Sequence, residues 1–175
     1  MNTIILIGYM GAGKTTIGHA LAKDMGMQFY DLDWYIEMRF RKSVAQIFEE
    51  RGEDGFREIE HNMLHEVAEF ENVIISCGGG TPCFFDNMEY MNSLCNTVYL
   101  KASPEVLAAH LRMGKVVRPL IAGKTEEELT DYIRESLEKR EPYYMQAKHI
   151  INVDLLNTKE KVEESVQLLK DVLDL

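Results

Sequence analysis

The sequence lacks the features that mark several classes of protein. No apolar stretch among its 175 residues approaches the roughly 20 residues that a membrane-spanning helix needs. The opening MNTIILIG has no basic segment and no cleavage pattern, so we expect a strand there and not a signal peptide. The three cysteines, Cys77, Cys83 and Cys95, form no Cys-x-x-Cys pair and leave one unmatched, which is typical of a reducing compartment. We therefore expect a cytoplasmic protein with no membrane partner.

Basic residues are also scarce. The chain has 19 lysines and arginines against 29 aspartates and glutamates, for a formal net charge of −10 at pH 7. Such a chain lacks the basic face with which nucleic-acid-binding proteins replace counterions, so we expect no nucleic-acid partner. No repeat, low-complexity tract or linker divides the sequence, and we expect one domain over residues 1–175.

Short β-rich runs alternate with helical patterns along the chain. The expected strands are residues 3–7, 28–30, 73–76, 97–100 and 149–153. Alternation of this kind predicts an α/β fold, in which right-handed crossovers build a parallel sheet with helices on both faces. Two connections are longer than plain crossovers. Residues 34–70 are themselves helical, and the basic, glycine-containing residues 113–124 are typical of a mobile lid.

The most specific motif follows the first strand. Gly8-x4-Gly13-Lys14-Thr15 is the P-loop pattern, and it stands between a strand and a helix as that motif requires. Glycines let successive backbone N–H groups surround phosphate oxygens, and the following helix directs its positive end at the same anion. We expect Lys14 to face solvent in the empty loop and to reach the β- and γ-phosphates of a nucleotide, while Thr15 coordinates Mg²⁺. The loop residues expected to contact the nucleotide are Gly11, Ala12, Gly13, Lys14, Thr15 and Thr16.

A P-loop does not determine where the phosphoryl group goes. The N-K-x-D signature of GTPases is absent, and a compact P-loop domain with a lid favours a small-molecule kinase. Asp31 and Asp33 follow the second strand and point the same way. One carboxylate can hold Mg²⁺ through water while the other orients an acceptor hydroxyl and takes its proton, although an isolated pair of this kind is often solvated loop. Arg57 and Glu60 fit either a site or an exposed i, i+3 ion pair.

The motifs taken together resemble the shikimate kinase family over nearly the whole chain. The segments that carry the resemblance are GYMGAGKTTIG, FYDLDWYIE, SVAQIFEERGEDGFREIE, CGGG, VRPLI and KREPYY, in family order and at family-like spacing. The resemblance implies a P-loop NTPase fold, a three-layer α/β/α sandwich whose five-stranded parallel sheet has the order 2-3-1-4-5. It also implies a helical substrate-binding insertion at about residues 33–61 and a lid at about residues 113–124.

The same resemblance implies a function. The family phosphorylates the 3-hydroxyl of shikimate with ATP, a step toward chorismate and the aromatic amino acids, and we expect a monomer that uses Mg²⁺. The residues implied to bind shikimate are Asp33, Arg57, Gly79, Gly80 and Arg140. Asp33 meets the ring hydroxyls, and the two arginines bind the carboxylate. Planar guanidinium forks suit a carboxylate, and these arginines also supply the local positive charge that so acidic a chain needs.

The remaining implied roles concern phosphate and metal. Arg118 of the lid reaches the phosphates, and Lys14, Asp33 and Arg118 are the implied catalytic residues. Thr15 ligates Mg²⁺ directly, whereas Asp31 and Ser76 lie near it through water. Phosphoryl transfer needs in-line alignment and charge neutralisation more than covalent chemistry, so it requires no other type of side chain than these.

One departure from the family pattern and one weak signal stay open. The stretch VDLLNTKEK after the last strand begins with leucines where many members carry a basic residue, so the contact with adenine is open, and Arg112 is a candidate for it. His61 and His65 have the i, i+4 spacing of a metal pair. However, HNMLH lacks the glutamate of the H-E-x-x-H motif and no third ligand is apparent, so a zinc site is disfavoured.

Two other functions stay open. Another small-molecule kinase of the same fold, such as a gluconate kinase, would use the same arginine forks for a different acid. A non-catalytic nucleotide-binding switch would need the P-loop and the Mg²⁺ ligands but not Asp33, Arg57 and Arg140, so the presence of these three residues counts against it.

Overall fold

The computed structural model describes residues 3–114 and 118–175. Five strands form one parallel sheet of order β2-β3-β1-β4-β5. They are β1 (Thr3–Ile7), β2 (Gln28–Asp31), β3 (Val73–Ser76), β4 (Asn96–Lys101) and β5 (His149–Asn152). Each predicted strand is confirmed to within one residue at either end. The predicted α/β class and the order of the sheet are confirmed as well.

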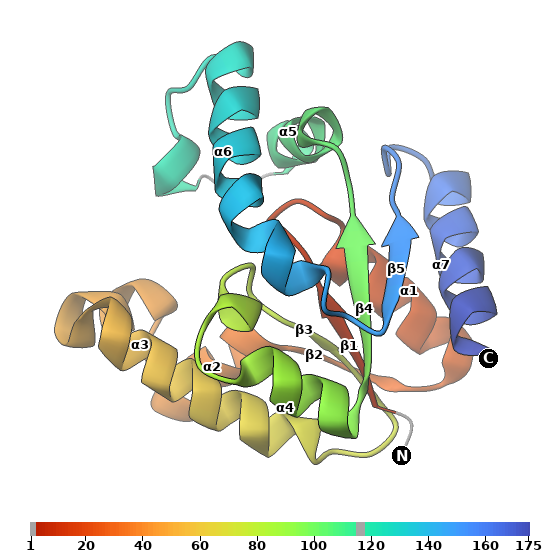
Figure 1. Cartoon of the computed structure of the whole chain (residues 1–175), viewed down its shortest axis with the longest axis horizontal. Coiled ribbons are helices and arrows are strands. Elements are labelled where there is room, and N and C mark those ends of the chain that lie inside the picture. Colours follow the sequence, from red (N-terminus) through yellow and green to blue (C-terminus); the bar gives the residue numbers. More distant parts are fainter. Residues whose placement is uncertain (1–2, 115–117) are drawn as a thin grey trace.

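Helices cover both faces of this sheet. They are α1 (Lys14–Met25), α2 (Leu32–Phe40), α3 (Val44–Ala68), α4 (Asn87–Leu94), α5 (Pro104–Met113), α6 (Glu126–Tyr144) and α7 (Lys159–Leu173), with short 3₁₀ turns η1 (Thr81–Cys83) and η2 (Pro119–Ile121). In Figure 1, α1 and α7 lie side by side next to one face of the sheet, and α4 crosses the other face. The sheet is therefore the middle of three layers, and α5 and α6 pack together beyond the carboxyl end of β4.

The central strands are apolar because both of their faces are covered. Every residue of β1 and of β3 is buried, and Ile5, Leu6 and Ile7 in β1 have no exposed surface. A strand buried on both faces reads as a continuous apolar run and not as an alternating one, which is why TIILI and VIIS are so distinct in the sequence. The rigid, buried centre of the sheet fixes the positions of the polar residues at the carboxyl ends of these strands.

Three chain segments meet at that edge. Asp31 at the end of β2 pairs in register with Ser76 at the end of β3, and Ser76 pairs in turn with Leu6 of β1. The P-loop leaves β1 one residue after Leu6. Ligands of open parallel α/β sheets bind at the carboxyl ends of the strands, so this edge is where a site is expected.

The helical connection between β2 and β3 is α2 followed by α3. Ser43 begins α3 with a capping box, in which its side chain accepts a hydrogen bond from the Gln46 N–H and the Gln46 side chain accepts one from the Ser43 N–H. The backbone of Gly52 is not helical (φ 69°, ψ −176°), so α3 bends there. The predicted insertion at residues 33–61 starts inside α2 and ends inside α3, and its role stays a prediction.

The predicted lid is only partly described. Met113 and Gly114 end α5, and η2 is the regular element within residues 118–124. Residues 115–117 of the lid lie outside the described residues, so the lid and the single-domain organisation of residues 1–175 stay predictions. No helix in the described part of the chain is long and apolar enough to cross a membrane.

Candidate active site

A cavity of about 400 Å³ opens where β1, β2 and β3 end. Its lining contains most of the residues that the sequence singles out: Gly11, Gly13, Lys14, Thr15, Thr16, Asp31, Asp33, Ser76, Gly79 and Arg118. It is also lined by residues to which the sequence assigned no role, namely Met10, Cys77, Gly78, His110, Met113, Gly114 and Leu156. The phosphate loop and the two aspartates are therefore parts of one site.

The P-loop presents backbone to this cavity. Gly13 precedes α1 with a left-handed backbone (φ 93°), and a Cβ there would lie 2.4 Å from Leu156 Cδ1, so this position requires glycine. Ala12 is fully buried, so it contributes backbone and not side chain to the loop. Among the described residues no side chain caps α1, which leaves its first N–H groups for an anion.

Lys14 does not face solvent, and this expectation was wrong. Its ammonium donates hydrogen bonds to the carbonyl oxygens of Gly8 and Tyr9, at 2.7 and 2.9 Å. The loop curls its own carbonyl groups around the lysine, so the charge is held inside the site before any phosphate contact. Burial, with a contribution from Arg118, lowers the pKa of Lys14 to about 8, although Cys77, Asp33 and Asp31 act in the opposite direction.

The two aspartates occupy different environments. Asp31 is the N-cap of α2, and its Oδ1 accepts the Trp34 N–H at 3.0 Å, so one of its carboxylate oxygens is engaged. Burial raises the pKa of Asp33 to about 6, and the nearby charges of Asp31 and Glu60 add to this. Lys14 and Arg57 only partly offset it. Asp33 is thus the carboxylate whose proton affinity lies near neutral pH, as a proton acceptor requires.

Glu60 is a site residue whose role the sequence left undecided. It is 1% exposed, its Oε1 accepts a hydrogen bond from Arg57 Nη1 at 2.9 Å, and its Oε2 accepts one from the Thr81 hydroxyl at 2.8 Å. The side chain of Arg57 is itself only 11% exposed. The interpretation of this pair as an exposed ion pair is therefore wrong. In the sequence, the local sign that Glu60 is buried is the apolar Phe56, which lies one turn earlier on α3 and is buried as well.

The glycine loop after β3 lies against two arginines, Arg57 and Arg140. A Cβ at Gly80 would lie 2.5–2.8 Å from the guanidinium of Arg57, and one at Gly79 would lie 3.1 Å from Arg140 Nη1. Only a residue without a side chain fits against Arg57 at this distance. Arg140 also lies over the ring of Tyr9, 5.6 Å from its centroid. Arg57, Arg140 and Gly80 border the cavity without lining it.

His110 is a polar lining residue of the cavity that two hydrogen bonds hold in place. The Leu156 N–H donates to His110 Nε2 at 2.8 Å, so Nδ1 carries the proton that is donated to the Gly11 carbonyl at 2.6 Å. His110 thereby joins the P-loop to the segment after β5, a contact for which the sequence contains no signal. Arg112 lies in an ion pair with Glu126 at 3.1 Å and is not among the lining residues, so its contact with a nucleotide stays a prediction.

Comparisons with known proteins point in one direction. A family model described as shikimate kinase matches residues 10–170. The shikimate kinase of Phocaeicola vulgatus is 58% identical over 174 residues, which are 99% of each chain. The 1.7 Å crystal structure of shikimate kinase from Bacteroides thetaiotaomicron has a TM-score of 0.96 and 56% identity over 99% of both chains. Shikimate kinase from Acinetobacter baumannii in complex with shikimate has a TM-score of 0.84 and 31% identity, over 99% of this chain and 94% of that one.

Proposed function

Because the chain belongs to the shikimate kinase family, we propose that it transfers the γ-phosphoryl group of ATP to the 3-hydroxyl of shikimate, which gives shikimate 3-phosphate and ADP. One observation carries this proposal. The cavity that holds the P-loop also holds Asp33, and Arg57 and Arg140 border it at the glycine loop. A phosphate cradle next to two guanidinium groups fits a kinase whose acceptor is an acid.

The acceptor is held by charge and by shape. Arg57 and Arg140 bind the carboxylate of shikimate, each as a planar fork, while Asp33 accepts hydrogen bonds from the ring hydroxyls. Gly79 and Gly80 allow the ring to approach the backbone. The buried Glu60 holds the Arg57 guanidinium at 2.9 Å, so the orientation of this fork is set before the substrate binds.

Transfer then needs alignment, charge neutralisation and a place for one proton. Asp33 orients the 3-hydroxyl and takes its proton as the new P–O bond forms, and a pKa raised to about 6 makes it a better acceptor than an ordinary carboxylate. Lys14 and Arg118 neutralise charge on the phosphoryl oxygens. The loop residues Gly11, Ala12, Gly13, Thr15 and Thr16 bind the phosphates through backbone and hydroxyl groups.

The donor set at the end of β2 and β3 suits Mg²⁺. The Thr15 hydroxyl, the free oxygen of Asp31 and the Ser76 hydroxyl all line the cavity, and hard oxygen donors are what Mg²⁺ selects. We propose that Thr15 binds the ion directly and that Asp31 and Ser76 bind it through water. When bound there, Mg²⁺ would supply positive charge to the phosphates of the nucleotide. Arg112 remains our candidate for a contact with adenine.

The functional residues for both substrates come from one chain, which supports a monomer as the active form. We propose that this monomer acts in the cytoplasm, in keeping with its unpaired cysteines.

A coupled assay of ADP release over a panel of hydroxy acids tests the function. Shikimate with ATP and Mg²⁺ should give turnover, whereas gluconate should give a rate close to that without acceptor. Turnover with gluconate but not with shikimate would favour the other kinase class. Tight ATP binding without turnover on any acid of the panel would favour a nucleotide switch. Either result would overturn the proposal.

A further inference from the structure

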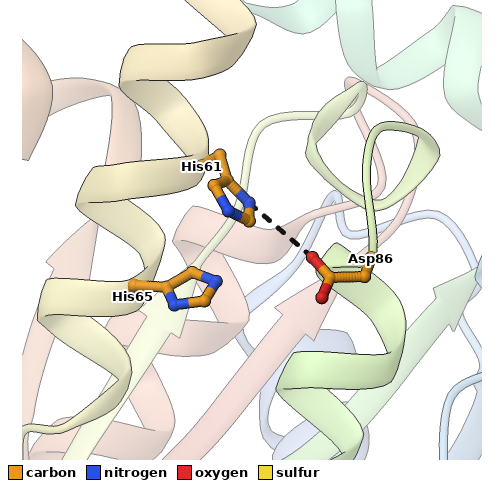
Figure 2. Close-up of side chains that lie close together, drawn as sticks. All are labelled: His61, His65 and Asp86. Atoms are coloured by element: carbon orange, nitrogen blue, oxygen red, sulfur yellow. Dashed lines mark ion pairs between the residues drawn. The ribbon is translucent and has the colours of Figure 1, made fainter.

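Two histidines and an aspartate lie together away from the cavity. His61 and His65 stand one turn apart on α3, and Figure 2 shows both rings turned toward Asp86, which comes from the segment before α4. One ligand atom from each of the three side chains lies within 4.8 Å of the other two. Their side chains belong to segments that only the fold brings together, so the third ligand that the sequence did not reveal is Asp86.

We propose that His61, His65 and Asp86 bind a transition-metal ion of the zinc type, and that the ion fastens α3 to the start of α4. Two imidazoles and one carboxylate are a common donor set for Zn²⁺. Ligands of one tetrahedral Zn²⁺ lie about 3.4 Å apart, from metal–ligand distances of about 2.0–2.1 Å. The distance between His61 Nδ1 and Asp86 Oδ1 is 4.0 Å and the three ligand atoms lie within 4.8 Å of one another, so the side chains must move inward before all three reach one ion.

The state of His65 favours a ligand. Its Nε2 is buried and has no hydrogen-bond partner among the described residues, which is uncommon for a buried polar atom. Its ring is stacked on that of Tyr90 at a centroid distance of 3.5 Å, so it cannot easily turn away.

The orientation of His61 is fixed by a neighbouring amide. Asn87 Nδ2 donates to the Thr81 carbonyl at 2.8 Å, so Asn87 Oδ1 faces His61 Nδ1, at 2.7 Å. A metal ion at this nitrogen would replace its proton, and Asn87 Oδ1 would have to move aside from the position it now holds in line with Nδ1. The side chain of Asp86 is 63% exposed, which leaves a route for the ion and for a water ligand.

This site differs in chemistry from the proposed magnesium site. Imidazole nitrogens select Zn²⁺, Ni²⁺ or Cu²⁺ over Mg²⁺, so the Mg²⁺ that accompanies ATP does not compete for it. The site also lies next to functional residues, because Glu60 precedes His61 and the Thr81 hydroxyl is bonded to Glu60. A metal ion here therefore stabilises the segment of α3 that carries Arg57 and Glu60, without contacting substrate.

Metal titration of the full chain tests the proposal. Protein without an affinity tag is freed of metal with a chelator and titrated with Zn²⁺ by calorimetry and with Co²⁺ by absorbance, in excess Mg²⁺. We expect one saturable equivalent. At a free Zn²⁺ concentration about 100 times the Kd, the Tm should rise by about 5–10 °C for a chain of this length. Failure to find saturable binding of either metal would overturn the proposal.

Variants locate the bound ion. Asp86→Asn removes an exposed carboxylate that makes no cap hydrogen bond to α4, so the fold is kept. We expect it to weaken Zn²⁺ binding at least 10- to 100-fold, the loss seen even for residues that only support ligands. His65→Gln should abolish the Tm shift. His149→Gln on β5 is the matched control and should bind as wild type does. Binding that survives both site variants, or that is lost on thiol alkylation alone, would place the ion elsewhere and overturn the proposal.

Discussion

Replacement of Arg57 by alanine is expected to do two separable things, to weaken shikimate binding and to destabilise the fold. The guanidinium of Arg57 lies 4.2 Å from the centroid of the Phe84 ring and donates to Glu60 at 2.9 Å. The Arg57 side chain is 11% exposed and that of Glu60 is 1% exposed. Shikimate binding weakens because the guanidinium of Arg57 is missing, whereas the fold loses stability because the buried carboxylate of Glu60 is left without its partner.

The two magnitudes follow from different terms. A hydrogen bond to a charged group contributes about 1.5–3 kcal/mol, so one lost fork should weaken shikimate binding by about 10- to 150-fold. Removal of one partner from a buried ion pair costs about 3–5 kcal/mol of the free energy of unfolding. The Thr81 hydroxyl still donates to Glu60 in the variant, which favours the lower end of that range. At about 2–4 °C per kcal/mol, a loss of about 3 kcal/mol lowers the Tm by about 6–12 °C.

Titration with shikimate and with ATP, well below the Tm, measures the first effect, and thermal unfolding measures the second. Adding Glu60→Gln to Arg57→Ala removes the stranded charge, so it should restore most of the Tm and none of the shikimate affinity. Arg57→Lys keeps charge without the fork and should recover part of each. Arg51→Ala, at an exposed arginine of the same helix, is the control. Wild-type shikimate affinity in Arg57→Ala, or its return with Glu60→Gln, would refute this account.

Three further substitutions test the other parts of the site. Asp33→Asn should lower turnover far more than ATP affinity, because the carboxylate acts on the acceptor; a loss confined to ATP affinity would instead place Asp33 at the metal. Wild-type turnover should fall as the pH drops below about 6, where Asp33 becomes protonated, and a pH–rate profile checks this. The pKa of Asp33 in the folded protein lies above the ordinary value of an aspartate, so keeping this carboxylate ionised costs stability as the pH rises above about 4. Asp33→Asn should therefore unfold at a higher temperature than wild type at about pH 8 and at the same temperature at about pH 4. Lys14→Ala should abolish turnover while far-UV circular dichroism stays native, and near-wild-type turnover would contradict the P-loop assignment. His110→Ala loses two hydrogen bonds, one donated to the Gly11 carbonyl and one accepted from the Leu156 N–H. It should raise the KM for ATP about 10-fold with a smaller change in kcat. An unchanged KM would show that the connection through His110 does not shape the nucleotide site.

The strands and the phosphate loop could be predicted because their signals are local. Strands covered on both faces need continuous apolar runs, and the turn at Gly13 accepts only glycine, so both patterns survive in the sequence. Asp31 and Asp33 could be placed from the position of one strand end. The resemblance to a family then supplied the sheet order and the roles of the arginines, neither of which follows from spacing alone.

The rest depends on contacts between distant segments. Nothing near His110 in the sequence shows that it bonds to Leu156, which is 46 residues away. Asp86 likewise joins His61 and His65 only after the chain has folded. The environment of Lys14 was misjudged for a different reason. Its partners are backbone carbonyl groups, and every residue has one, so residue identities carry no record of them.

Because Lys14 is held against two carbonyl oxygens in a buried position that lowers its pKa, we expect nucleotide binding to be coupled to proton uptake by this residue. With a pKa of about 8, about half of the free protein carries this proton at that pH, and a polyphosphate beside the amine favours the charged form. Lys14 should therefore take up to about half a proton from solution when nucleotide binds near pH 8, and calorimetry at that pH in buffers of different ionisation enthalpy measures this uptake. If Lys14 binds phosphate as proposed, its ammonium would exchange carbonyl oxygens for phosphate oxygens, and the removal of its charge from water would belong to the free energy of folding and not to that of binding.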